Sequence, residues 1–115
     1  MLFRSTLGDF LAREGVSVCG AATKELPPSE FQKINSRDHM HMAYDLGRRA
    51  FLDNPGCDGI YIGGGTWLAE PVSLELEREF GRPAICNQTA QLWDMLNILK
   101  AWKPIPGHGK LLAAA

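Results

Sequence analysis

Residues 57–67 read CDGIYIGGGTW, and this stretch decides the fold. The apolar run 60–62 is typical of a buried strand, and the glycines after it are typical of a tight turn into a helix. Three successive glycines leave no side chain to block an approaching group. In an open α/β sheet, small ligands bind where such turns follow the carboxyl ends of strands. We therefore expect a binding site to include the turn made by Gly63, Gly64, Gly65 and Thr66.

The length and composition predict a single globular domain over residues 1–115. Charged residues make up 22% of the chain and apolar residues 45%, which is typical of a soluble protein. The formal net charge is −1 and there is no basic run, so nucleic acid is not an expected partner. No apolar run is long enough to span a membrane or to form a signal-peptide core, so we expect no membrane association.

The cysteines, Cys19, Cys57 and Cys86, lack the spacing of metal ligands. An odd number of cysteines without a signal sequence predicts free thiols in a reducing compartment, and hence a cytoplasmic protein. Nothing else in the sequence indicates a metal site or an organic cofactor, and we expect neither.

Apolar periodicity predicts that helices and strands alternate along the chain. We predict helices over 5–14, 37–53 and 70–80, a last helix that follows Asn87–Thr89 and runs to Trp102, and strands over 16–19, 58–62 and 83–86. Ser36 is the expected N-cap of the second helix, and Gly81 is the expected C-cap of the third. This alternation predicts parallel strands joined by right-handed crossovers, in a three-layer α/β domain with a short parallel sheet.

Three parts of the chain fall outside this regular pattern. Because the chain opens on a helix, the strand that would precede that helix is missing. Residues 1–4 are either a stub of that strand, or a partner chain supplies it. Residues 21–34 form a long connection, a feature that is often functional. The tail over 103–115 is rich in proline and glycine, and we expect it to be extended.

Three further segments suggest a family. Residues 74–83 read LELEREFGRP, residues 86–93 read CNQTAQLW, and residues 104–112 read PIPGHGKLL. Together with the glycine turn, in this order and at this spacing, they resemble the aspartate/glutamate racemase superfamily, in particular its maleate cis-trans isomerase and arylmalonate decarboxylase branch. The resemblance covers most of the chain, but only the second half of a typical two-lobe member.

The resemblance implies one lobe of the racemase fold, with a site that holds a small dicarboxylate on backbone N–H groups of the turns. In the two-cysteine members, each lobe offers one thiolate to the substrate carbon, and such a thiolate needs a lowered pKa. Here the first lobe is absent, and Gly64 stands where the cysteine of the second lobe would be. A glycine cannot transfer a proton, so the resemblance implies a degenerate site.

Two groups of residues join the glycine turn as site candidates. Asn87, Gln88 and Thr89 either contact the ligand or only cap the last helix. For proton transfer the candidates are His39, in the first turn of its helix, and Cys86, at the end of a strand. Their structural alternatives are a partly buried or capping histidine, and a small apolar core residue.

The remaining histidines and the tryptophans have plainer expected roles. We expect His41 to face solvent and His108 to pack against the domain. We expect Trp67, Trp93 and Trp102 to lie in the core or at an interface. Aromatic residues on a domain that lacks the first lobe favour a homodimer, in which a second copy covers the docking face.

The sequence thus leaves three functional hypotheses. The first is an isomerase- or decarboxylase-like protein that acts on a small dicarboxylate without a cofactor. The second is a non-catalytic module that binds a small carboxylate or acts through oligomer contacts. The third is a gene fragment that folds but has no biochemical role.

Overall fold

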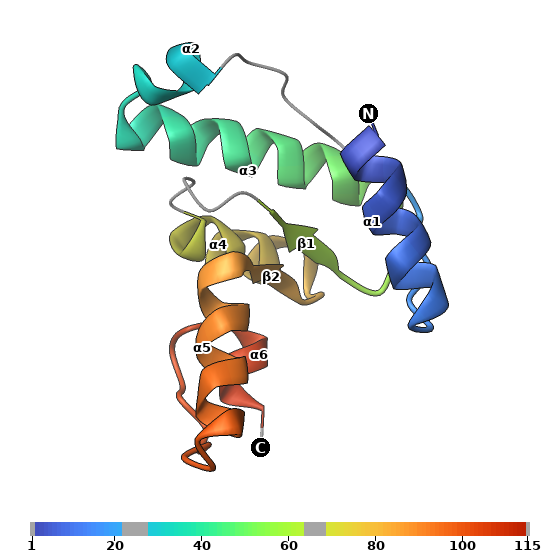
Figure 1. The fold of residues 1–115 in the computed structure, drawn as a ribbon. Coiled ribbons are helices and arrows are strands. Elements are labelled where there is room, and N and C mark those ends of the chain that lie inside the picture. Colours follow the sequence, from blue (N-terminus) through green and yellow to red (C-terminus); the bar gives the residue numbers. More distant parts are fainter. Residues whose placement is uncertain (1, 22–27, 64–68, 115) are drawn as a thin grey trace.

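A computed structural model of the chain describes residues 2–21, 28–63 and 69–114 (Figure 1). Its elements, in chain order, are α1 (Leu2–Arg13), α2 (Pro28–Gln32), α3 (Ser36–Asp53), β1 (Ile60–Ile62), α4 (Glu70–Phe80), β2 (Ala84–Cys86), α5 (Asn87–Ile98) and α6 (Lys110–Ala113). The two strands pair in parallel, with Ile60 opposite Ala84 and Ile62 opposite Cys86. The predicted α/β class with a short parallel sheet is confirmed. Within the described ranges, no helix has the length and apolarity needed to cross a membrane.

The core lies where α3 and α4 pack against each other and against the sheet. Leu76 of α4 is completely buried, and Ala43 and Phe51 of α3 are 2% exposed. Fully burying a leucine or phenylalanine side chain stabilises a fold by about 1.5–3 kcal/mol. In Figure 1, α3 lies across the top of the sheet, and α5 runs away from the sheet toward the C-terminus.

The ends of α3 and α4 follow from local hydrogen bonds. The N-cap of α3 is Asn35 rather than Ser36, because Asn35 Oδ1 accepts from the backbone N–H of Asp38 at 2.9 Å. Asn35 Nδ2 also donates to Asp38 Oδ2 at 3.2 Å, which links the two side chains at the start of the helix. Helix α4 ends at Gly81 as predicted, with a left-handed φ of 68° and its N–H bonded to Glu77 O at 2.8 Å.

A polar link also joins α3 to α4. The Glu79 carboxylate accepts hydrogen bonds from the Tyr44 hydroxyl and from Arg48 Nε, the latter at 3.0 Å. The hydrogen bond from Tyr44, and then that from Arg48, hold the pKa of Glu79 below its ordinary value. Reciprocally, the hydrogen bond to Glu79 raises the pKa of Tyr44.

The sheet has one strand fewer than predicted. Residues 16–19 are extended but form no strand, since Ser17, Val18 and Cys19 have no backbone hydrogen-bond partner among the described residues. An extended segment becomes a strand only through pairing with a neighbour. Residues 2–4 belong to α1, so they are not a stub of a preceding strand.

The C-terminal tail is docked through Glu77, which is only 8% exposed. One carboxylate oxygen of Glu77 accepts from the backbone N–H of Ala84 at 3.1 Å, and the other accepts from that of Lys110 at 2.9 Å. These bonds favour the short helix α6 where the sequence predicted an extended tail, and they allow Leu112 to be buried. The long connection likewise contains α2, while its residues 22–27 lie outside the described ranges.

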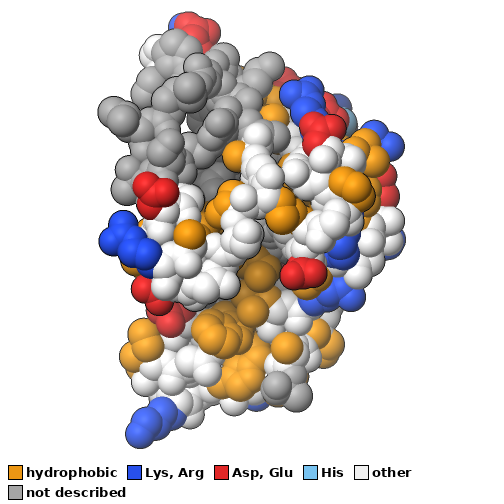
Figure 2. All heavy atoms as spheres, turned by 90° about the vertical axis from the view of Figure 1, so that its right-hand side faces the viewer, with side chains coloured by type: hydrophobic (Ala, Val, Ile, Leu, Met, Phe, Trp, Pro, Cys, Tyr) orange, Lys and Arg blue, Asp and Glu red, His pale blue; other side chains and the backbone are white. Residues whose placement is uncertain are grey.

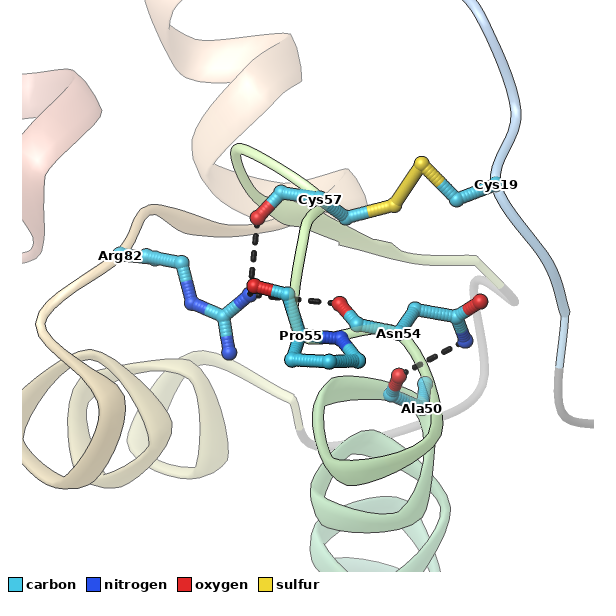
Figure 3. Close-up of a disulfide and its surroundings, with 6 residues drawn as sticks. All are labelled: Cys19, Ala50, Asn54, Pro55, Cys57 and Arg82. Atoms are coloured by element: carbon cyan, nitrogen blue, oxygen red, sulfur yellow. Dashed lines mark hydrogen bonds between the residues drawn. A yellow bond between two sulfur atoms is a disulfide. The ribbon is translucent and has the colours of Figure 1, made fainter.

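The expectation of free thiols is wrong for two of the cysteines. The fold brings the Cα atoms of Cys19 and Cys57 to 6.3 Å, and the two residues form a disulfide (Figure 3). Cys86 is the free cysteine. Beside the disulfide, Arg82 Nη1 donates to the carbonyl oxygen of Cys57 at 2.8 Å, and its guanidinium lies 4.3 Å from the centre of the Phe51 ring. The loop before β1 is therefore held by the disulfide to Cys19 and by the hydrogen bond from Arg82.

Candidate functional site

The carboxyl ends of β1 and β2 meet at one edge of the sheet because the two strands run parallel. At this edge the Tyr61 hydroxyl donates a hydrogen bond to Asn87 Oδ1. Tyr61 projects from the middle of β1, and its side chain is 53% exposed, whereas its neighbours Ile60 and Ile62 are half-buried. The alternation of side chains along a strand explains why the polar tyrosine lies opposite to the two isoleucines.

Sequence reasoning missed Tyr61. A polar aromatic residue between two β-branched ones in a short strand was the available signal, because its hydroxyl can reach the turn that follows the next strand. Gly63 lies directly against it, since a Cβ added at Gly63 would stand 3.3 Å from Tyr61 Cε1. The other residues of the predicted turn, Gly64, Gly65 and Thr66, lie outside the described ranges.

The three residues predicted at the end of β2 have different positions. Asn87 is half-buried and bonded to Tyr61, and Gln88 is exposed in the first turn of α5. Thr89 is buried, and its hydroxyl donates to the carbonyl oxygen of Cys86 at 3.1 Å. Asn87 is thus held at the edge by Tyr61, whereas the Thr89 hydroxyl is bonded to the end of β2.

The candidates for proton transfer are both buried. Cys86 is completely buried, and its sulfur lies 3.5 Å from Thr89 Oγ1, as expected for a small core residue. His39 is 9% exposed in the first turn of α3, as expected for a partly buried histidine. His41 is exposed, as predicted. His108 is not packed as predicted, because it is exposed and its Nδ1 lies 3.1 Å from Glu70 Oε1.

The first turn of α5 adds backbone donors to the edge. Its N-cap, Cys86, makes no capping hydrogen bond from its side chain. The first N–H groups of an α-helix have no partner inside the helix, and they favour anions through the helix dipole. In the described part of the chain, no group of His, Cys, Asp and Glu residues is arranged to hold a metal ion. The Tyr61 hydroxyl already donates to Asn87, and the remaining donors at this edge, side-chain amides and helix N–H groups, suit a small anion.

A parallel α/β lobe with such donors at its strand ends belongs to the general class of small-ligand-binding α/β domains. A sequence model of the arylmalonate decarboxylase family matches residues 3–112, and the chain belongs to this family. A comparison with curated protein sequences found no match. The predicted resemblance to the racemase superfamily, in its decarboxylase branch, is therefore confirmed.

Solved structures agree with the family. A sulfate-associated glycine-to-cysteine variant of arylmalonate decarboxylase is 27% identical, with a TM-score of 0.81, and the match covers 95% of this chain and 46% of that one. Another arylmalonate decarboxylase structure is 25% identical, with a TM-score of 0.81, over 97% of this chain and 48% of that one. The chain thus spans about half the length of the solved relatives that it matches.

Proposed function

We propose that the chain is an arylmalonate decarboxylase-like lobe that binds a small dicarboxylate at the carboxyl edge of β1 and β2. The family match supports this, and so does the relative that was solved in association with a sulfate ion. The observation that carries the proposal is the hydrogen bond from Tyr61 to Asn87, which joins the ends of both strands into one polar edge. One carboxylate is held by the first N–H groups of α5, with Asn87 and Gln88 beside them.

The second carboxylate is assigned to the glycine turn, over Gly63, Gly64, Gly65 and Thr66. Side chains are absent over the three glycines, so backbone N–H groups can approach an anion closely. Thr89 contributes by holding the first turn of α5 to β2 rather than by touching the ligand, because its hydroxyl is bonded to Cys86 O.

We further propose that the site binds better than it catalyses. Gly64 offers no thiol at the family's cysteine position, so His39 or Cys86 would have to move the proton. The complete burial of Cys86 against Thr89 argues against its use as a nucleophile and leaves His39 as the better candidate. The alternative function is accordingly a non-catalytic module that binds small carboxylates.

Proton NMR in D₂O tests this function directly. The purified protein is incubated with maleate, phenylmalonate, aspartate and glutamate, and isomerisation, decarboxylation and α-proton exchange are followed together. Binding without turnover, with turnover appearing only in Gly64→Cys, is the result expected of a degenerate site. Turnover by the unaltered chain that is lost in His39→Ala but kept in Cys86→Ala would instead establish a relocated base. The absence of both binding and turnover would support the gene-fragment hypothesis.

We also propose that the chain acts as a homodimer. An apolar face made by α5 and its C-cap residue is exposed, and it consists of Leu92, Trp93, Met95, Ile98 and Leu99, with Ile98 71% and Leu99 70% exposed. Figure 2 shows hydrophobic side chains gathered in the lower part of one face of the molecule. Such patches on soluble proteins normally mark interaction sites.

Sedimentation equilibrium tests the dimer. We expect Ile98→Glu to shift the protein to a monomer, because a buried charge on an apolar interface is costly. The matched control is Leu52→Glu on α3, since Leu52 is also exposed, at 55%, but lies outside this face. A wild-type protein that stays monomeric at high micromolar concentration would contradict the dimer.

A further inference from the structure

The Cys19–Cys57 disulfide joins two parts of the chain that are otherwise loosely connected. One part is an N-terminal arm, which consists of α1 and the segment 14–20. The other part is the body, which consists of α3, α4, α5, α6 and the sheet. Among the described residues, the extensive packing between elements lies within the body, and α1 takes no part in it. The apolar core likewise contains no described residue of the arm.

The hydrogen bonds of the arm hold it to itself rather than to the body. The backbone N–H groups of residues 14–16 all donate to residues of α1, as Val16 does to Leu11 O at 2.8 Å. Residues 17–19 have no backbone hydrogen-bond partner within the described ranges, and residues 12–20 are all exposed. A segment with few buried contacts and a solvent-exposed backbone has a low local stability. The disulfide is therefore the main link between the arm and the body.

The body holds its own side of the disulfide without help from the arm. Arg82 Nη1 donates to Cys57 O at 2.8 Å and to Pro55 O at 3.3 Å (Figure 3). Asn54 Nδ2 donates to Ala50 O at 2.9 Å, and Asn54 O accepts from the Cys57 N–H at 3.1 Å. These bonds do not depend on the disulfide. When it is cut, the arm rather than the loop is the part that can move.

We propose that the disulfide is a reductive switch, which releases the arm while the body stays folded. Cys19 is exposed and Cys57 is half-buried, so a thiolate reaches the Cys19 sulfur more readily. A dithiol reductant attacks this sulfur and forms a mixed disulfide with Cys19, and the Cys57 thiolate leaves. The second thiol of the reductant then displaces Cys19. The reductant becomes a cyclic disulfide, and two electrons and two protons pass to the protein.

The switch controls whether an apolar part of α3 is covered. A cleft between the arm and the body is lined by Leu11 and Val18 of the arm and by Leu46 and Ala50 of α3. Release of the arm removes one wall of this cleft. The side chains on the α3 wall then become more accessible to solvent, whereas the core beneath them stays packed.

Limited proteolysis with trypsin tests the release. The protein is left oxidised, or is reduced with dithiothreitol and alkylated with iodoacetamide before trypsin is added, and cleavage after Arg13 is followed by mass spectrometry. We expect reduction to speed this cleavage by about tenfold or more, because a protease cuts a segment that has opened locally. Cleavage after Arg78 is the internal control, because Arg78 is also exposed but lies in the packed helix α4. Its rate should change by less than about twofold.

Two cysteine variants and a reoxidation step separate the switch from other effects of the reductant. Cys19→Ser cannot form the disulfide and should be cut after Arg13 at the fast rate without any reductant. Cys86→Ala lacks the buried free thiol but keeps the disulfide, so it should respond to reduction as the unaltered protein does. Reoxidation of the reduced protein with oxidised glutathione, before alkylation, should restore slow cleavage.

Three results would overturn the proposal. Cleavage after Arg13 at one rate in both redox states would show that the disulfide does not hold the arm. Equal acceleration after Arg13 and Arg78 would show that reduction unfolds the whole chain. Fast cleavage that persists after reoxidation would show that the release is not a switch. None of these measurements uses a carboxylate ligand, so the switch and the proposed function are tested separately.

Discussion

The Tyr61 hydroxyl donates to Asn87 Oδ1, and this bond connects the middle of β1 to the first residue of α5. The two residues are 26 positions apart in the sequence. The bond orients the Asn87 amide at the edge where we place the dicarboxylate. The ligand's affinity should therefore depend on a hydroxyl that belongs to neither turn.

The first prediction concerns this hydroxyl. Tyr61→Phe removes one hydrogen bond, which is worth about 1 kcal/mol, and should weaken maleate binding by about fivefold. Isothermal titration calorimetry gives the affinity, and urea unfolding checks that the fold is retained. In a double-mutant cycle with Asn87→Ala, the two effects should be less than additive, because both variants break the same bond. Additive effects would mean that the bond does not position Asn87 for the ligand.

The second prediction concerns two helical glycines. A Cβ at Gly47 would lie 2.5 Å from Leu76 Cδ1, and Leu76 is completely buried. Overpacking against Leu76 should destabilise Gly47→Ala by about 1–3 kcal/mol. The higher helix propensity of alanine should offset about 1 kcal/mol of this loss. In Gly8→Ala, nothing lies within 4 Å of the added Cβ, so this variant should be stabilised by up to about 1 kcal/mol. Thermal unfolding of both variants should show shifts of opposite sign.

The third prediction concerns the buried carboxylate that docks the tail. Glu77→Ala leaves the N–H groups of Ala84 and Lys110 without their acceptors, and should cost about 2–4 kcal/mol. The control is Glu75→Ala, because Glu75 pairs with Arg78 and both side chains are more than half exposed. Exposed pairs contribute about 0–1 kcal/mol. Equal losses in the two variants, measured by urea unfolding, would contradict the docking role of Glu77.

The fourth prediction is a pH dependence. Because the pKa of Glu79 is lowered in the folded state, its ionised form stabilises the fold. This contribution is complete above the ordinary glutamate pKa of about 4.3, and it is lost as the pH falls through the lower folded value. The free energy of unfolding, measured with urea between pH 7 and pH 3, should therefore fall less steeply for Glu79→Gln than for the unaltered protein.

Tyr44→Phe offers a second check of the same network. The hydrogen bond from Tyr44 is the largest cause of the lowered Glu79 pKa, so this variant should also flatten the pH profile. A profile identical to that of the unaltered protein in both variants would show that this link between α3 and α4 does not contribute.

The elements that local patterns specify were predictable. The helices over 36–53 and 70–80 have a continuous apolar face, and Gly81 supplies the turn that ends the second of them. The two strands are apolar runs followed by turn residues. The glycine turn and the segment 87–89 could be placed together, because parallel strands end at one edge.

The features that the sequence could not predict depend on contacts between distant residues. Helix α6 needs Glu77, which lies 33 residues before Lys110. The disulfide joins cysteines 38 residues apart, and no local pattern connects them. The segment 16–19 has the composition of a strand, but composition does not supply the neighbour with which a strand pairs.

The disulfide also changes the unfolded chain. It closes a loop of 38 residues that contains all of α2 and α3. In the chain-entropy view, closing a loop of this size removes disorder from the unfolded ensemble worth about 4 kcal/mol at 25 °C. That is a large share of the 5–15 kcal/mol by which domains are ordinarily stable. The stability of the fold therefore depends on the redox state of its surroundings. In a reducing compartment, the remaining contacts would have to hold the fold alone.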